Sequence, residues 1–166
     1  MKRIHICGIY GSGKSNLAKG ISKFLSIPVY SLDDIKYEIK YSKVRPVEER
    51  IRRIKEICKK EYWIIEGTWS DYAEEAFRSS DFVILMIPSK ILCSYRVLKR
   101  HLARKKEEND TLIETIKLVR EIYRYYKKNR PVSLITHKEF IKKYNKKHFI
   151  IKNNSDIRRL FVFLRN

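Results

Sequence analysis

The stretch Gly8-Ile9-Tyr10-Gly11-Ser12-Gly13-Lys14-Ser15 matches the pattern G-x-x-x-x-G-K-[ST], in which a backbone loop wraps around phosphate groups. Glycines let such a loop form a concave nest of N–H groups, and a helix that begins there adds its positive N-terminal dipole. Lys14 supplies a mobile cation for the β- and γ-phosphates, and the Ser15 hydroxyl is a ligand for the Mg²⁺ that accompanies the nucleotide. The stretch therefore predicts a site for ATP with Mg²⁺, formed by Gly8, Gly11, Ser12, Gly13, Lys14 and Ser15.

The segments on either side of this loop have the character that the motif requires. An apolar run at residues 4–9 precedes it and is typical of a buried strand, and residues 16–25 have a helical pattern. A glycine-rich turn with an incidental lysine is the alternative interpretation, and this strand–loop–helix context argues against it.

Strand and helix patterns alternate along the rest of the chain, which predicts an α/β fold with a parallel sheet covered on both faces. The expected strands are residues 3–7, 29–32, 62–65, 82–87 and 148–151. The expected helices are residues 16–25, 35–60 with a break at 44–46, 71–78, 88–106, 111–128, 137–144 and 157–164. Ligands of such sheets bind at the carboxyl ends of the strands. Asp33, Asp34 and Glu66 follow the second and third expected strands and are therefore candidate site residues.

Size and composition indicate one globular domain, which we expect to span residues 1–166. No apolar run approaches the ~18 residues that cross a membrane. The apolar stretch near the start leads into the phosphate loop, so a cleaved signal peptide is not expected. We therefore predict a cytoplasmic protein without a membrane partner. Cys7, Cys58 and Cys93 have neither the spacing of a zinc site nor that of a disulfide framework.

The formal net charge is +19, with 38 Lys and Arg against 19 Asp and Glu. A nucleotide kinase needs cations around two bound phosphate chains, a nucleic-acid-binding protein needs a continuous basic face, and a lysine-rich proteome raises the charge without any specific partner. We favour the first and third explanations. Nonspecific affinity for nucleic acid is expected in each case, because charge alone attracts a phosphate backbone.

With these motifs in place, the chain resembles the nucleoside-monophosphate-kinase branch of the P-loop kinases. Within it, the chain is similar to adenylate-kinase-related proteins called "DNA topology modulation protein" (FlaR-like). The resemblance covers roughly residues 3–104 and rests on the segments 3–15, 27–34, 63–69, 78–87 and 93–100. It implies a three-layer α/β/α fold with five parallel strands in the order 2-3-1-4-5, an acceptor-binding region at residues 35–60 and a short lid at residues 104–112.

The sequence also departs from this family's pattern. Asn16 stands where threonine usually follows the serine, and its amide still reaches toward an α-phosphate. The third strand ends in Glu66-Gly67 rather than Asp-Gly, and the fourth strand ends without an acidic residue. A carboxylate that holds Mg²⁺ must therefore be Glu66 or Asp33.

The resemblance assigns roles to several residues. It implies that Lys14 and Arg100 stabilise the transferred phosphoryl group, that Asp33 orients or deprotonates the acceptor hydroxyl, and that Arg96 lies against the nucleotide base. Further acceptor or phosphate contacts are expected from Asp34, Arg78, Arg104, Arg120 and Arg124. The alternatives stay open: one of the two aspartates caps a helix, and Arg96, Arg100 and Arg104 form a solvated basic stripe.

The residues together predict an enzyme, a P-loop phosphotransferase that transfers the ATP γ-phosphoryl group to a nucleotide, a nucleoside or a similar small acceptor, as a monomer or dimer. The competing prediction is an ATP-dependent protein that binds nucleic acid or phosphorylates its ends. Salt dependence of nucleic-acid binding distinguishes specific recruitment from attraction by charge alone.

Overall fold

The computed structural model describes residues 2–39, 43–69, 71–103 and 112–165. Its centre is a five-stranded parallel sheet in the order β2-β5-β1-β6-β7. The strands are β1 (Arg3–Gly8), β2 (Val29–Ser31), β5 (Trp63–Glu66), β6 (Phe82–Met86) and β7 (Lys147–Ile151). In chain order within this sheet these are strands one to five, so the expected order 2-3-1-4-5 and the α/β fold class are both confirmed.

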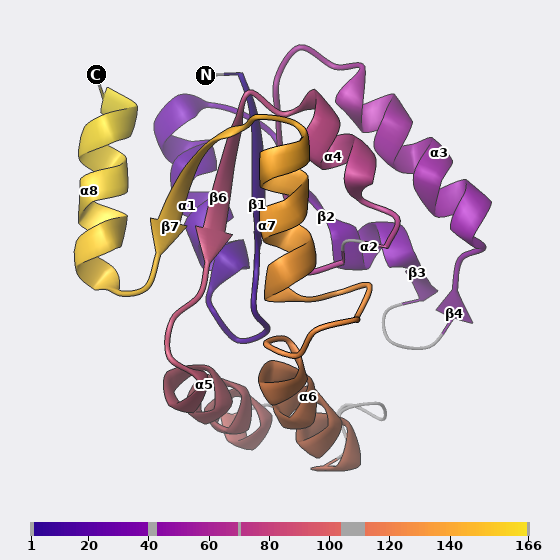
Figure 1. Ribbon diagram of the computed structural model, residues 1–166, viewed down its shortest axis with the longest axis vertical. Helices are drawn as coiled ribbons and strands as arrows, with labels where there is room; N and C mark the ends of the chain where they lie inside the picture. Colours follow the sequence, from indigo (N-terminus) through magenta and orange to yellow (C-terminus); the bar gives the residue numbers. More distant parts are fainter. Residues whose placement is uncertain (1, 40–42, 70, 104–111, 166) are drawn as a thin grey trace.

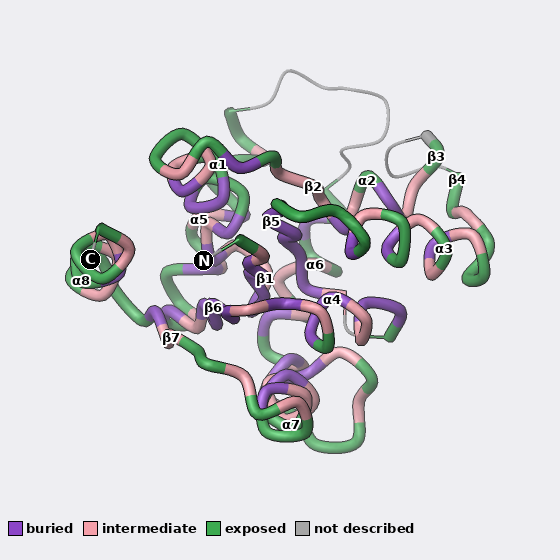
Figure 2. The backbone as a smooth tube through the Cα atoms, turned by 90° about the horizontal axis from the view of Figure 1, so that it is seen from above, coloured by how far each residue is buried: buried purple, intermediate pink, exposed green. Residues whose placement is uncertain are grey.

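Helices cover both faces of the sheet, as Figure 1 shows. On one face, α1 (Lys14–Leu25) and α8 (Asn154–Arg165) pack on the side chains of Ile4 and Ile6. On the other face lie α3 (Val47–Cys58), α4 (Glu74–Ser79) and α7 (Leu134–Lys143). Both faces of the central strands are therefore buried, which explains why these strands read as continuous apolar runs. In Figure 2 the residues of β1, β5 and β6 are mostly coloured as buried.

Two further helices lie beyond the carboxyl ends of the strands, α5 (Lys90–Ala103) and α6 (Leu112–Arg124) (Figure 1). They pack against each other and, through Cys93, Val97 and Ile122, against Ile9 of the phosphate loop. The loop is therefore enclosed between the sheet and this helix pair. None of the described helices is long and apolar enough to cross a bilayer.

The prediction of a helix across residues 35–60 is only partly right. The segment begins as a short helix, α2 (Leu32–Lys36), then forms a two-stranded antiparallel sheet of β3 (Tyr37–Ile39) and β4 (Lys43–Val44) before α3. The Arg45 guanidinium stops α2, because it donates to the carbonyl oxygens of Asp34, Ile35 and Tyr37. Tyr37, Ile39 and Val44 are residue types that favour strands, so their β propensity agrees with the backbone pairing of β3 and β4.

The expected lid at residues 104–112 lies outside the described residues except for Leu112, which begins α6.

Candidate active site

The phosphate loop joins β1 to α1 and has the conformation that the motif predicts. Gly8, Gly11 and Gly13 all have positive φ, at 135°, 71° and 94°. A Cβ on Gly8 would lie 2.1 Å from the Met86 carbonyl oxygen, and one on Gly11 would lie 2.6 Å from that of Cys93. Any side chain at these two positions would therefore displace the loop. Gly13 caps α1 without a side-chain hydrogen bond, which leaves the first N–H groups of the helix available to an anion.

The ammonium group of Lys14 rests on the loop itself. Its Nζ donates to the carbonyl oxygen of Ile9 at 2.8 Å and to that of Gly8 at 3.3 Å. Burial lowers the pKa of Lys14, and the nearby carboxylates of Glu66 and Asp33 oppose that shift. Lys14 is 8% exposed, so it is a largely desolvated cation, which attracts phosphate oxygens more strongly than a solvated one.

Ser15 and Glu66 meet at the carboxyl edge of the sheet. The Ser15 hydroxyl donates to Oε1 of Glu66 at 3.1 Å, and Glu66 is 6% exposed. Burial raises the pKa of Glu66, while the Lys14 ammonium counteracts part of that rise. The two oxygen ligands that the sequence assigns to Mg²⁺ are therefore adjacent.

Asp33 lies in the first turn of α2, and its carboxylate is held by an indole. Trp69 Nε1 donates to Asp33 Oδ1 at 2.7 Å. The N-cap of α2 is Ser31, whose Oγ accepts from the Asp33 N–H at 3.2 Å, so the alternative in which an aspartate caps this helix is wrong. Asp34 is exposed, and it contributes a backbone carbonyl to Arg45.

Gly67, directly after Glu66, brings β5 into contact with α2. A Cβ on Gly67 would lie 2.5 Å from the Cβ of Leu32, the residue before Asp33. Tyr72 reinforces this contact, because its hydroxyl donates to the Leu32 carbonyl at 2.8 Å. Only glycine permits so close an approach, and it places the elements that carry Glu66 and Asp33 side by side.

The expected arginines lie in different surroundings. Arg96 Nη1 donates to the Ser12 carbonyl at 3.0 Å, so this guanidinium lies on the phosphate loop. Arg100 and Arg120 are exposed, on α5 and α6. Arg124 forms an ion pair with Glu121 at 2.9 Å. Arg104 lies outside the described residues.

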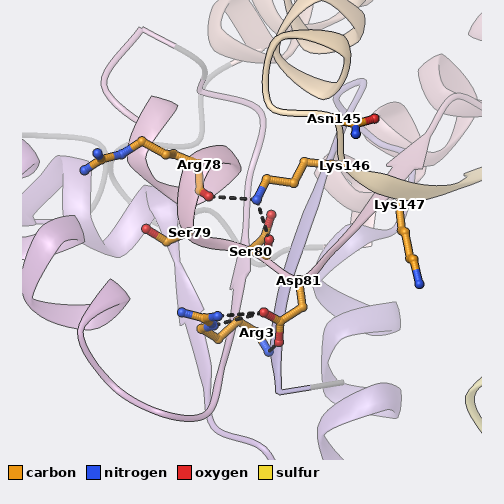
Figure 3. A pocket seen from close by; sticks show the side chains of 8 residues that line it. All are labelled: Arg3, Arg78, Ser79, Ser80, Asp81, Asn145, Lys146 and Lys147. Atoms are coloured by element: carbon orange, nitrogen blue, oxygen red, sulfur yellow. Dashed lines mark hydrogen bonds and ion pairs between the residues drawn. The ribbon is translucent and has the colours of Figure 1, made fainter.

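The structure does not bring Arg78 to this site, and the prediction that it recognises an acceptor phosphate there is corrected. Arg78 lines an open pocket of about 530 Å³ together with Arg3, Asp81 and Lys146, at the amino ends of the strands (Figure 3). The guanidinium pairs with Glu75 at 2.6 Å. Arg78 ends α4, a helix that runs antiparallel to the strands, and this explains its position at the edge opposite to the phosphate loop.

Two cations lie near Asp33, of which only Arg50 escaped the sequence interpretation, because Lys36 belongs to the basic residues at 35–60 that favour an anionic acceptor. The Lys36 Nζ lies 3.1 Å from the ring centroid of Trp69, and burial lowers its pKa. Arg50 is 9% exposed, its guanidinium lies 5.1 Å from the ring centroid of Tyr72, and it forms no ion pair within the part of the chain that the structure describes. Arg50, Ile54 and Cys58 are buried at a spacing of four, so their periodicity was the signal that Arg50 faces inward.

The residues present fit a nucleotide with Mg²⁺. Ser12 is 2% exposed, and its buried Oγ has no hydrogen-bond partner among the described residues, as expected of a group that binds a phosphate oxygen. Among the described residues there is no group of three or more His, Cys, Asp or Glu that could hold a metal ion. The described residues offer Mg²⁺ Ser15 and neighbouring carboxylates, a partial set that phosphate oxygens and water would complete.

Comparison with known proteins identifies the fold. No family model matches the chain. A segment of 32 residues is 53% identical to shikimate kinase of Chlamydia pneumoniae, over 19% of this chain and 18% of that enzyme. The crystal structure of shikimate kinase from Bacteroides thetaiotaomicron is similar over 99% of both chains, with a TM-score of 0.62 and 18% identity.

An uncharacterized protein from Eubacterium ventriosum is similar over 100% of this chain and 99% of its own, with a TM-score of 0.55 and 15% identity. Because both sequence identities are low, the structural similarity shows a shared fold and no more. The chain has the fold of a P-loop kinase, shared along nearly its full length with a shikimate kinase.

Proposed function

We propose that this protein is a phosphotransferase that moves the γ-phosphoryl group of ATP, bound with Mg²⁺, to a hydroxyl group of a small acceptor. The observation that carries the proposal is the arrangement of three groups at the carboxyl edge of the sheet. The phosphate loop holds Lys14, Ser15 contacts Glu66, and Asp33 is fixed by Trp69. A triphosphate cradle beside an oriented carboxylate is what transfer to a hydroxyl requires.

The phosphate loop and several arginines are assigned to bind the phosphates of ATP. The loop N–H groups and Lys14 hold the β- and γ-phosphates, and Ser15 with Glu66 holds Mg²⁺, which neutralises charge on the transferred group. Asn16 and Arg96 are assigned to the nucleotide, because both adjoin the loop. Arg100, Arg104, Arg120 and Arg124 are proposed as phosphate contacts of the loaded enzyme.

Asp33 is assigned to activate the acceptor hydroxyl. Its carboxylate accepts the hydroxyl proton while the acceptor oxygen forms a bond to the γ-phosphorus and the bond from that phosphorus to the β,γ-bridging oxygen breaks. ADP leaves with the electron pair of that bond. Trp69 donates to Oδ1 of Asp33, and we assign Oδ2 to the acceptor hydroxyl.

Lys36 and Arg50 give the acceptor region two inward cations, which favours an acceptor that carries a phosphate or a carboxylate. Nucleotides and small hydroxylated acids are therefore the favoured acceptors, and nucleosides complete the test panel as the uncharged class that the sequence leaves open. Shikimate belongs in that panel, because one of the solved structures similar to this chain is a shikimate kinase.

The similarity of residues 3–104 to the adenylate-kinase-related "DNA topology modulation protein" group remains part of the proposal and rests on sequence motifs alone. We also propose a cytoplasmic location, supported by three buried, unpaired cysteines.

The test is ADP release by purified protein with ATP and Mg²⁺, alone and with pools of nucleoside monophosphates, nucleosides, small hydroxylated acids and short oligonucleotides. We expect one small-molecule pool to stimulate release, and Lys14→Ala to abolish the stimulation. Stimulation by oligonucleotides alone would replace this proposal with the nucleic-acid alternative. No stimulation by any pool would contradict both.

A further inference from the structure

A chain of buried hydrogen bonds runs from α6 through α7 to the loop that follows β5. The hydroxyl of Tyr125, the residue after α6, lies 2.6 Å from Nδ1 of His137 on α7. Nε2 of the same ring lies 3.1 Å from the carbonyl oxygen of Thr68. His137 is 0% exposed, Tyr125 1% and Thr68 4%, so water does not compete for these bonds.

The chemistry of the three groups fixes the direction of both bonds. A carbonyl oxygen only accepts, so Nε2 of His137 carries the proton and donates to Thr68. Nδ1 of the neutral ring then accepts from the Tyr125 hydroxyl. Burial lowers the pKa of His137 to about 3, which keeps the ring neutral and this tautomer in place.

Each end of this hydrogen-bond chain adjoins a segment that carries residues of the candidate site. Tyr125 packs with Ile9 beneath the phosphate loop. Thr68 is followed by Trp69, whose indole holds Asp33. The hydrogen bonds of His137 go to Tyr125 and Thr68, and these residues adjoin the phosphate loop and Trp69.

We propose that His137 is a positioning residue. Its two hydrogen bonds hold the loop after β5 at a fixed position relative to the end of α6. Through Trp69, this loop then fixes the orientation of the Asp33 carboxylate. The inference rests on the proposed function for its kinetic part only. The loss of either hydrogen bond leaves a buried polar group unpaired, and the loop relaxes to find a new partner for it. Asp33 then loses its alignment, while the phosphate loop keeps its own contacts.

The structural test uses the two tryptophan indole N–H signals in ¹H–¹⁵N NMR spectra of the whole protein, assigned with Trp69→Phe. Trp69 reports on the loop, and Trp63, which is buried in β5 and whose Nε1 bonds to no group in the described part of the chain, is the internal reference. We expect His137→Leu and Tyr125→Phe to shift the Trp69 signal and leave the Trp63 signal in place. His137→Gln, which offers an amide N–H to Thr68 and an amide oxygen to Tyr125, should restore the Trp69 signal.

The matched control is Tyr126→Phe, which removes the neighbouring hydroxyl outside this hydrogen-bond chain. It should leave both signals unchanged. An unmoved Trp69 signal in a folded His137→Leu or Tyr125→Phe protein would overturn the proposal. Equal movement of both indole signals would also overturn it, because that result describes general loosening of the core. If His137→Leu does not fold, Tyr125→Phe decides.

The kinetic test separates positioning from packing. With the acceptor found above, His137→Leu should lower kcat roughly tenfold and change KM for ATP by less than about twofold, because misalignment of one reacting group costs rate rather than nucleotide affinity. A rise in KM for ATP with kcat unchanged would contradict the proposal. If the wild-type protein transfers phosphate to no acceptor, the proposed function fails, and the NMR result still decides the role of His137.

Discussion

The indole N–H of Trp69 and Oδ1 of Asp33 are 2.7 Å apart, a hydrogen bond between two elements that are 36 residues apart in the sequence. It ties the loop after β5 to the first turn of α2. The same indole carries the Lys36 ammonium on its face. One aromatic side chain therefore organises both the proposed base and a cation of the acceptor region.

Trp69→Phe removes the donor to Asp33 and keeps an aromatic ring under Lys36. We expect kcat to fall roughly tenfold, because Asp33 samples unproductive orientations, with ATP affinity unchanged. Steady-state kinetics and calorimetry with ATP measure the two quantities. In a double-mutant cycle, Trp69→Phe should add little to Asp33→Asn. Full additivity would show that Trp69 acts elsewhere.

Glu66→Gln keeps the size of the side chain and removes its charge beside Ser15. We expect roughly tenfold to a hundredfold weaker binding of Mg²⁺–ATP, by loss of a carboxylate that holds the metal, and little change for ATP without Mg²⁺. Titrations with and without Mg²⁺ separate the two. An equal loss of ATP affinity with and without Mg²⁺ would mean that Glu66 supports the conformation of the phosphate loop rather than binding the metal.

Arg50→Met keeps the buried aliphatic stem and removes the cation. Loss of a charge-assisted contact of about 2 kcal/mol corresponds to a rise of roughly thirtyfold in KM for an anionic acceptor. Arg52→Met, on the exposed side of the same helix, is the matched control and should leave KM unchanged. If both variants behave alike, Arg50 does not face the acceptor.

Acid should destabilise the fold through two buried histidines. Burial lowers the pKa of His5 to about 4 and that of His137 to about 3, from 6.5. Because the unfolded chain binds protons more readily, stability is lost as pH falls below 6.5 and continues to fall until the folded-state pKa values are reached. At pH 5 each histidine costs about 2 kcal/mol.

Urea unfolding at pH 7, 6 and 5 measures this loss, in a range above the titration of most carboxyl groups. His137→Gln should reduce the loss between pH 7 and pH 5 by about half. A stability that stays constant across this range would mean that the two rings become protonated inside the folded protein.

Much of the fold was readable from the sequence because its strongest features are local. The phosphate loop has obligatory glycines, and the central strands are buried on both faces, so their apolar runs stand out. The β3–β4 hairpin was missed because residues 37–44 contain no glycine or proline to mark a turn. The end of α2 is held by Arg45, which is eight to eleven residues away in the sequence from the three carbonyls to which it donates.

Site residues that lie next to the ends of strands could be predicted from the sequence. Residues whose position or role depends on tertiary contacts could not. Ser15 and Glu66 follow neighbouring strands and do meet. Arg78 was misplaced because a helical arginine carries no sign of which end of the sheet it faces. Trp69 lies within the segment 63–69 that carries the family resemblance, but its role depends on a hydrogen bond to a distant helix, which no sequence pattern indicates.

The contact between Gly67 and Leu32 constrains how this site can change over evolution. A Cβ at position 67 would lie 2.5 Å from the Cβ of Leu32, an atom that every residue except glycine carries, so a smaller side chain at position 32 does not relieve the clash. We therefore expect glycine to persist at position 67 among homologous sequences, while the part of the side chain beyond the Cβ at position 32 varies. The close approach of the segments that carry Glu66 and Asp33 would then be retained wherever this fold is inherited.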